Sequence, residues 1–224
     1  MATATMMSAA RMPAVARAPK AKVAAASAVG PKPVDTAKSG ADFVAQLPGA
    51  IPPFDEPFLD PLKFSEGMSS KDLLRFREAE LTHGRVAMLA SVGFLVGEQV
   101  EGSSFLFDKY ISGPAIGHFQ QVEEVAPAFW ETIALSVAVA ETLRVQRGWA
   151  DPYEGDEAWW ALKDGYYPGD LKFDPLGLEP LTQEDFEDMQ LKELSNGRLA
   201  MIAISGMVAQ ELVDGKTLVG HFAS

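Results

Sequence analysis

The sequence predicts an all-α membrane protein with three transmembrane helices, in which the first and third helices cross as a pseudo-two-fold pair. The main observation is an internal repeat: segments 80–102 and 193–215 align without gaps, with 11 identities in 23 positions. A third helical pattern, at 127–147, lies between the two copies. Opposite charges on the repeats are the third observation, because they can pair only if the two copies pack against each other.

The first and third helices are expected at about 71–100 and 184–213. Serine or threonine, which are favoured N-cap residues, precedes each of them, and each repeat ends on a glycine, a frequent helix stop. The middle helix is expected at 127–147 and begins with a proline, which suits a first helical turn. Trp130 and Trp149 lie near its two ends, where membrane helices often carry interfacial tryptophans.

Each repeat carries one glutamate and one arginine five residues apart, Glu80 with Arg85 and Glu193 with Arg198. Five residues correspond to about 140° of rotation, so the two side chains of one helix point to different faces. If the helices cross, Glu80 can pair with Arg198, and Glu193 with Arg85. We expect this reciprocal pairing, because an unpaired buried ion is strongly destabilising.

These patterns leave open whether the helices lie in a membrane. No stretch of about 18 uncharged apolar residues occurs, and the mean hydropathy is +0.02, which favours a soluble helical protein. Paired charges and small residues at the expected contact, such as Gly84 and Gly197, favour a membrane helix pair. A soluble helix hairpin with a buried ion-pair network fits about equally well.

Composition excludes several classes of function. The 224 residues include no cysteine, so disulfides and thiolate metal sites are excluded, and the three histidines are too few for a histidine-rich metal site. The formal net charge is -12. Residues 1–40 hold six of the 19 basic and one of the 31 acidic side chains, so residues 41–224 carry -17. Nucleic acid is not an expected partner of so acidic a chain.

The N-terminal segment has the composition of an organelle transit peptide. Residues 1–34 are rich in alanine, contain lysine and arginine, and include no carboxylate. We expect 1–40 to be a transit peptide with a flexible N-terminus, and 41–224 to form a single domain.

The repeats also present single oxygen and nitrogen donors. Glu80 and His83 lie three residues apart on one helix, and Glu193 and Asn196 occupy the equivalent positions on the other. Gln210, 14 residues after Asn196, returns to the same helix face about 21 Å further along. One Glu-x-x-His unit resembles half of a di-iron site, but the second repeat has asparagine where such an enzyme needs histidine.

The middle helix adds Glu141 and Arg144, an i, i+3 pair on one face. A chlorophyll magnesium is held by four ring nitrogens and needs one axial donor, which a carboxylate, an amide or an imidazole can supply. A glutamate paired with an arginine keeps a spare lone pair and brings no net charge into the core. Taken alone, these residues are better explained as ordinary surface or core side chains, but the joint pattern favours magnesium ligation.

These segments resemble the light-harvesting chlorophyll-binding protein family. ELTHGRVAMLA at 80–90 and LKELSNGRLAM at 191–201, with YPGDLKFDPLGL before the second, carry the resemblance, which extends from about 55 to 215. It implies that the two Glu–Arg bridges lock the crossed helices, and that the Asp-Pro-Leu segments at 60–62 and 174–176 lie beside two carotenoids. It also implies that the axial chlorophyll ligands are Glu80, His83, Glu141, Glu193, Asn196 and Gln210, with ion-pair partners Arg85, Arg198 and Arg144.

The function that the resemblance implies is that of a light-harvesting antenna without enzymatic activity. Such a protein of the plastid thylakoid membrane binds chlorophyll a, chlorophyll c and carotenoids (xanthophylls), and transfers excitation energy to a photosystem. Its partners are a photosystem core, neighbouring antenna subunits and thylakoid lipids. The segment GPAIGHFQQV and the short connections are most similar to red-lineage antennae of the fucoxanthin type. A photoprotective, energy-dissipating stress-related member of the family is the alternative.

Overall fold

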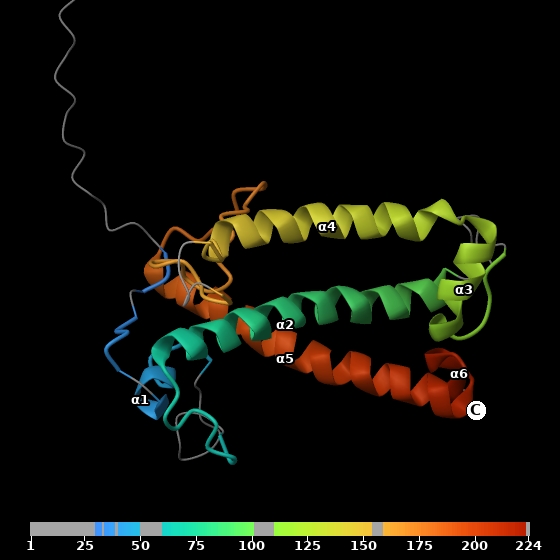
Figure 1. Cartoon of the computed structure of the whole chain (residues 1–224). Coiled ribbons are helices and arrows are strands. Elements are labelled where there is room, and N and C mark those ends of the chain that lie inside the picture. Colours follow the sequence, from blue (N-terminus) through green and yellow to red (C-terminus); the bar gives the residue numbers. More distant parts are fainter. Residues whose placement is uncertain are drawn as a thin grey trace, which may run out of the picture.

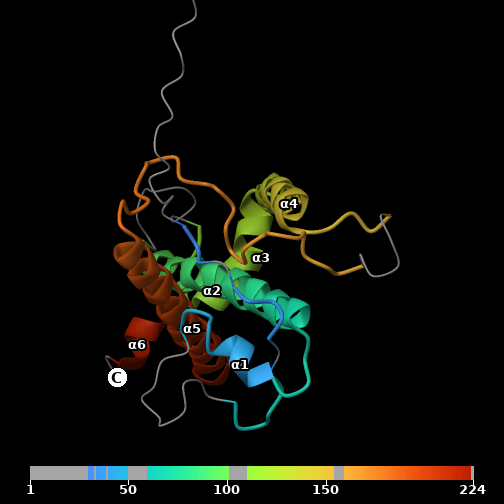
Figure 2. The same cartoon turned by 90° about the vertical axis from the view of Figure 1, so that its left-hand side faces the viewer.

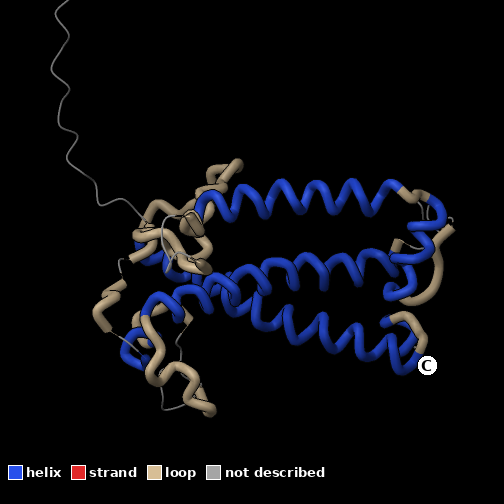
Figure 3. Tube along the Cα trace, in the orientation of Figure 1, coloured by secondary structure: helices blue, strands red, loops and turns tan. Residues whose placement is uncertain are grey.

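The computed structural model describes residues 30–32, 34–38, 40–49, 60–100, 110–153 and 159–222. Within these residues the fold is all-α, as the sequence predicts, and Figure 3 contains no strand. The helices are α1 (Gly40–Val44), α2 (Ser70–Gln99), α3 (Ala115–Val125), α4 (Ala128–Gly148), α5 (Gln183–Asp214) and α6 (Leu218–Phe222).

α2 and α5 contain the two copies of the repeat and cross each other (Figures 1 and 2). At the crossing point a Cβ added to Gly84 would lie 3.0 Å from the Cα of Gly197, and one added to Gly197 would lie 3.1 Å from the Cα of Gly84. Any larger residue would force the backbones apart, so equivalent glycines of the two repeats set the crossing point. The predicted packing of the first helix on the third is therefore confirmed.

The N-termini of the two crossed helices are capped in the same way. The Ser69 hydroxyl accepts a hydrogen bond from the backbone N–H of Asp72, and the Thr182 hydroxyl accepts one from Asp185. At the other end α5 stops at Gly215, which adopts the left-handed conformation with φ 63°. The middle helix α4 begins one residue after Pro127, which is its N-cap residue.

An N-terminal arm (residues 30–32, 34–38 and 40–49) lies against the start of α2 and α5. The side chain of Gln183 exchanges two hydrogen bonds with the backbone of Gly30, and Lys32 forms an ion pair with Glu187 at 2.8 Å. Phe43, which is fully buried, packs in a small hydrophobic cluster with Leu73 of α2. The expected targeting segment, 1–40, thus overlaps a part of the chain that contacts both crossed helices.

α4 has few protein neighbours along its length. Every residue from 131 to 140 is exposed, although this run covers all faces of the helix and is mostly apolar. Gly148, its last residue, is the only buried residue of α4. In Figure 1 the helix extends alongside the crossed pair and is connected to it at its two ends.

Three membrane-spanning helices were the expectation from sequence. By length and hydropathy, none of the helices within the described residues qualifies as a membrane span.

Candidate functional site

Both predicted ion pairs are present and join α2 to α5. Nε of Arg85 lies 2.8 Å from Oε1 of Glu193, and Nε of Arg198 lies 2.7 Å from Oε1 of Glu80. The four side chains are between 27% and 43% exposed, so they are partly shielded by the protein. The reciprocal neutralisation expected from the repeat is confirmed.

Each of these arginines has a second acceptor that sequence reasoning missed. Nη2 of Arg85 donates to the carbonyl of Gly169 at 2.9 Å, and Nη1 of Arg198 donates to the carbonyl of Gly49 at 3.1 Å. Both glycines follow a proline, in the dipeptides at 48–49 and 168–169. A Pro-Gly dipeptide therefore occurs before each copy of the repeat, and this shared dipeptide could have indicated two matching turns from the sequence.

The two bridging glutamates have different surroundings. Glu80 has a second cation nearby, because Nε of Arg77 lies 3.5 Å from its Oε2. Arg77 is 9% exposed and donates from Nη1 to the carbonyl of Pro48 at 2.8 Å. For Glu193, Arg85 is the cation within ion-pair distance among the described residues. The two halves of the molecule are therefore similar in geometry and unequal in charge.

His83 and Asn196, at equivalent repeat positions, use the same backbone contact. Nδ1 of His83 lies 2.7 Å from the carbonyl of Ala79, and Nδ2 of Asn196 donates to the carbonyl of Lys192 at 2.8 Å. A carbonyl oxygen only accepts, so Nδ1 of His83 carries a proton, and in the neutral imidazole Nε2 is then the nitrogen with the lone pair. In the same way the amide oxygen of Asn196 remains an acceptor. Both side chains are exposed and are held by one bond each.

Gln210, the predicted donor near the end of α5, lies beside Asp214 and His221. The amide nitrogen of Gln210 contacts Asp214 and also lies 3.1 Å from Nδ1 of His221, which leaves its carbonyl oxygen as the acceptor. Nδ1 of His221 is in turn 2.6 Å from a carboxylate oxygen of Asp214. His118, on α3, places Nε2 2.9 Å from the carbonyl of Gly113.

Glu141 and Arg144 form the predicted pair on α4, with Nε of Arg144 2.9 Å from Oε2 of Glu141. Arg144 is shared with Glu78 of α2, a residue that the sequence analysis overlooked and that is 2% exposed. Glu78 also accepts hydrogen bonds from the hydroxyl of Tyr166 and from the N–H of Gly169, at 3.1 and 2.7 Å. Burial, with the nearby Glu78 carboxylate, raises the pKa of Tyr166, which therefore remains a hydrogen-bond donor at neutral pH.

The Asp-Pro-Leu segments form two matching turns. Asp60 accepts hydrogen bonds from the backbone N–H groups of residues 64 and 65, and Asp174 accepts them from residues 178 and 179. These hydrogen bonds favour the charged form of each carboxyl. The pKa of Asp60 is lowered most by a hydrogen bond from the Ser65 side chain and then by the backbone N–H groups. The pKa of Asp174 is lowered most by the backbone N–H of Leu178.

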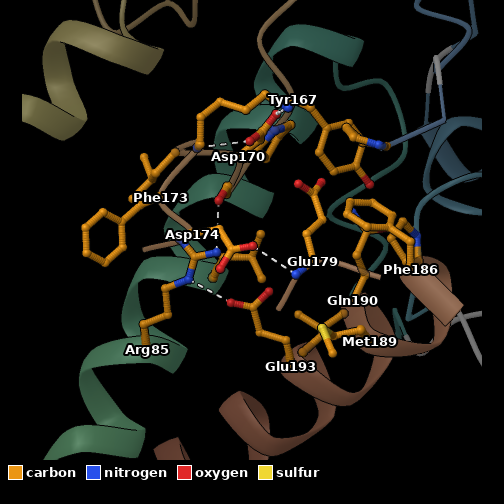
Figure 4. A pocket seen from close by; sticks show the side chains of 18 of the residues that line it. Arg85, Tyr167, Asp170, Phe173, Asp174, Glu179, Phe186, Met189, Gln190 and Glu193 are labelled. Atoms are coloured by element: carbon orange, nitrogen blue, oxygen red, sulfur yellow. Dashed lines mark hydrogen bonds and ion pairs between the residues drawn. The ribbon is translucent and has the colours of Figure 1, made fainter. Parts of the chain in front are cut away.

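A cavity of about 620 Å³ lies beside the second of these turns, between it and the crossed helices. Figure 4 shows residues that line it, among them the polar side chains of Arg85 and Glu193 and the apolar side chains of Phe173 and Met189. The corresponding part of the first half includes residues 50–59, which lie outside the described residues.

Comparisons with known proteins identify relatives along most of the chain. A family model described as Chlorophyll A-B binding protein matches residues 43–212. The chain is 51% identical over 181 residues, 80% of its length and 69% of the relative's, to the light-harvesting complex stress-related protein 1, chloroplastic, of Chlamydomonas reinhardtii. It is 42% identical over 205 residues, 91% of its length and 94% of the relative's, to the fucoxanthin-chlorophyll a-c binding protein, chloroplastic, of Isochrysis galbana.

A more distant relative is the chlorophyll a-b binding protein 3, chloroplastic, of Pisum sativum, with 31% identity over 203 residues, 80% of this chain and 72% of the relative. The matched range contains the first repeat, the middle helix, residues 193–212 of the second repeat and every residue predicted as a chlorophyll ligand. Proteins of this family bind chlorophyll, are not enzymes, reside in the chloroplast thylakoid membrane and associate with photosystems. The chain belongs to the chlorophyll a/b-binding family of light-harvesting proteins.

Proposed function

We propose that this protein binds chlorophylls and carotenoids in the thylakoid membrane and dissipates excitation energy, as a photoprotective, stress-related member of its family. We choose dissipation because the chain has 51% sequence identity to a stress-related relative and 42% to a fucoxanthin-chlorophyll a-c binding relative. The stress-related alternative from the sequence analysis therefore takes precedence over a red-lineage light-harvesting antenna.

Pigment binding is supported most directly by the contacts of His83 and Asn196. Each side chain donates one hydrogen bond to a backbone carbonyl of the preceding turn. Nε2 of His83 and the amide oxygen of Asn196 remain as acceptors on an exposed face of their helices. A metal-ligating histidine typically donates its other ring N–H to a carbonyl or carboxylate, which fixes the tautomer. Histidine and asparagine so held are suited to give one axial bond to a magnesium.

The remaining proposed ligands keep a free acceptor as well. Glu193 engages Arg85 through Oε1, Glu141 engages Arg144 through Oε2, and Gln210 uses its amide nitrogen. Each glutamate is charge-balanced by an arginine, so it can ligate a metal without adding a bare charge to an apolar setting. We include Glu80 in this set, with Arg198 as its main partner.

The isolation of α4 supports both pigments and a membrane around the helices. Ten consecutive residues of α4, 131–140, are exposed on all faces of the helix, and most of them are apolar. In water this would be an unfavourable surface, because large exposed apolar areas are rare in soluble monomers. We propose that pigments cover the side toward α2 and α5, that lipid covers the other, and that α2, α4 and α5 cross the membrane.

We propose that chlorophyll a is one of the bound pigments. Chlorophyll c and xanthophylls are the remaining candidates, chlorophyll c on the strength of the Isochrysis galbana relative. The cavity beside the second Asp-Pro-Leu turn combines apolar walls with a few polar groups, which suits the end ring of a long apolar pigment.

Light harvesting for a photosystem is the second candidate function. It is favoured by the match to the fucoxanthin-chlorophyll a-c binding relative, which covers 94% of that protein. The two functions require the same pigment sites and differ in what happens to the excitation energy.

One experiment on the detergent-purified holoprotein tests both proposals. Chromatography of extracted pigments identifies the chlorophylls and xanthophylls, and a colourless preparation would rule out pigment binding. The fluorescence lifetime of the same preparation is then measured at about pH 7.5 and pH 5. A lifetime shortened several-fold relative to a light-harvesting protein of the same family, at either pH, supports dissipation. A long lifetime at both pH values supports harvesting instead.

A further inference from the structure

We infer that the Pro168–Gly169 turn is a positioning element that keeps one carboxylate oxygen of Glu193 free for an axial metal bond. The inference rests on the proposed function, since it assigns a role to the turn in pigment ligation by Glu193. The turn at Pro48–Gly49 is its counterpart for Glu80 in the other half of the molecule.

Arg85 divides between two acceptors the pair of donors with which an arginine commonly binds one carboxylate. A guanidinium presents its donors as a planar fork, and the edge formed by Nε and Nη2 commonly takes both oxygens of one carboxylate. In this protein that edge of Arg85 is divided: Nε donates to Oε1 of Glu193 at 2.8 Å, and Nη2 donates to the carbonyl of Gly169 at 2.9 Å. Figure 4 shows the single bond between Arg85 and Glu193. The carbonyl of Gly169 therefore competes with the second carboxylate oxygen for Nη2 of Arg85.

The turn is fixed in place by contacts on both sides of Gly169. Its N–H donates to the buried Glu78 at 2.7 Å, while its carbonyl accepts from Arg85. Glu78 is also bound by Arg144, the partner of Glu141. One peptide segment thus connects the surroundings of two proposed ligands, Glu193 on α5 and Glu141 on α4.

Only glycine fits at the two turn positions. Gly169 has φ 83°, and Gly49 has φ 89°, a region that side-chain-bearing residues rarely adopt. A Cβ at Gly169 would lie 2.7 Å from a methyl carbon of Leu81, and one at Gly49 would collide with Leu194. Leu81 and Leu194 are themselves equivalent residues of the repeat, so the same packing recurs in both halves.

The two halves differ in the number of cations near the bridging glutamate. Near Glu80 the second carboxylate oxygen lies 3.5 Å from Arg77, whereas near Glu193 no second cation is within ion-pair distance among the described residues. The oxygen that the turn protects is therefore most accessible on Glu193. The effect of disturbing a turn should be largest at Gly169.

The test is pigment stoichiometry of the purified holoprotein with Gly169→Ala. The added methyl displaces the turn, its carbonyl leaves Nη2, and Arg85 can then bind both oxygens of Glu193. We expect the loss of one chlorophyll per polypeptide. Gly177→Ala is the matched control, because Gly177 also has positive φ, 64°, but its Cβ would meet no atom within 4 Å. The control should retain the full pigment number.

A rescue variant separates positioning from simple packing damage. In Gly169→Ala combined with Arg85→Lys, the compact ammonium cannot hold both oxygens in a fork, so the lost chlorophyll should return. Arg85→Lys alone gives the reference pigment number for the double variant, because Arg85 is itself the partner of Glu193. If Gly169→Ala does not accumulate, Gly169→Asn replaces it, because asparagine tolerates positive φ while its Cβ still meets Leu81.

Different outcomes would overturn the positioning role of the turn and the proposed pigment binding. Full pigment in the folded Gly169 variant, or a double variant as depleted as the single one, overturns the positioning role. A wild-type protein that binds no chlorophyll overturns the proposed function itself.

Discussion

At the scale of single residues, the repeat gives the two halves of the molecule matching donors with different chemistry. His83 and Asn196 share a position, a bond to the preceding turn and an exposed face, but one presents an imidazole nitrogen and the other an amide oxygen. Different axial donors place different charges near the pigments and so can tune their absorption. The backbone contact, rather than the residue type, determines that one lone pair is available.

The first prediction concerns these two donors. His83→Ala and Asn196→Ala should each remove one chlorophyll per polypeptide and leave helix content unchanged, because neither side chain has a packing role. Asn196→His and His83→Asn should retain the pigment, because each substitution restores the donor used by the other repeat. Pigment counts from chromatography and circular dichroism of the purified holoprotein measure both effects. An unchanged count in the alanine variants would exclude these residues as ligands.

The second prediction compares the two bridging arginines. Arg85→Leu should destabilise the protein more than Arg198→Leu, because Arg77 remains 3.5 Å from Glu80 while Glu193 keeps no cation within ion-pair distance among the described residues. We expect a loss of about 1–3 kcal/mol for Arg85→Leu, below the value for fully buried pairs because these side chains are about one-third exposed. Thermal unfolding of the two variants in detergent measures the order. Equal stability would show that Arg77 does not compensate.

The sequence was most informative where an interaction joins two side chains. The Glu80–Arg198 and Glu193–Arg85 pairs followed from charge and spacing alone. The bonds to the carbonyls of Gly49 and Gly169 did not, because the repeated Pro-Gly dipeptide indicates two turns but not that their carbonyls accept from the arginines. The sharing of Arg144 between α4 and α2 depends on tertiary packing, which periodicity within one helix cannot indicate.

At the scale of elements, the turns at Asp60 and Asp174, which precede α2 and α5, have the same hydrogen-bond pattern. Asp60 and Asp174 each bind two backbone N–H groups four and five residues later, and so close each turn just ahead of a helix start. The sequence indicated a turn at each Asp-Pro-Leu segment. It did not indicate that the aspartate holds the turn, since the same residue is also common in open loops.

The third prediction is a pH dependence of these turns. The lowered pKa of each carboxyl means that the folded turn favours the ionised form. Its stabilisation is complete above the unfolded pKa of about 3.9 and is lost as the pH falls through the lower folded pKa. Hydrogen exchange at residues 178 and 179 should therefore be unchanged between about pH 7 and 5, after correction for intrinsic rates, and should increase below about pH 4. Asp174→Asn should abolish this acid transition, whereas Glu179→Gln, which removes only a neighbouring charge, should preserve it.

At the scale of the whole molecule, the N-terminal arm joins the two crossed helices from outside. It bonds to α5 through Gly30 and Lys32, and it packs on α2 through Phe43. The composition of residues 1–40 predicted a targeting peptide, and composition alone cannot tell where such a peptide ends and a folded arm begins.

The fourth prediction places the processing point within that N-terminal region. The mature protein should begin before Gly30, as intact-mass measurement of the protein from thylakoids would show. A chain lacking residues 1–29 should bind its full pigment complement. A chain lacking residues 1–40 should melt about 3–6 °C lower, because it loses the ion pair with Glu187 and the bonds to Gln183. Equal melting temperatures for the two chains would show that the arm adds no stability.

The bare stretch of α4 has a consequence for the life of the protein in the cell. In the polypeptide, residues 131–140 of this helix are exposed and mostly apolar. Under the proposed function pigment and lipid cover them, so a chain that has not yet bound pigment resembles a partly unfolded protein and is open to proteases. The amount of this protein should therefore follow the rate at which the plastid manufactures pigment, even when its messenger RNA is abundant.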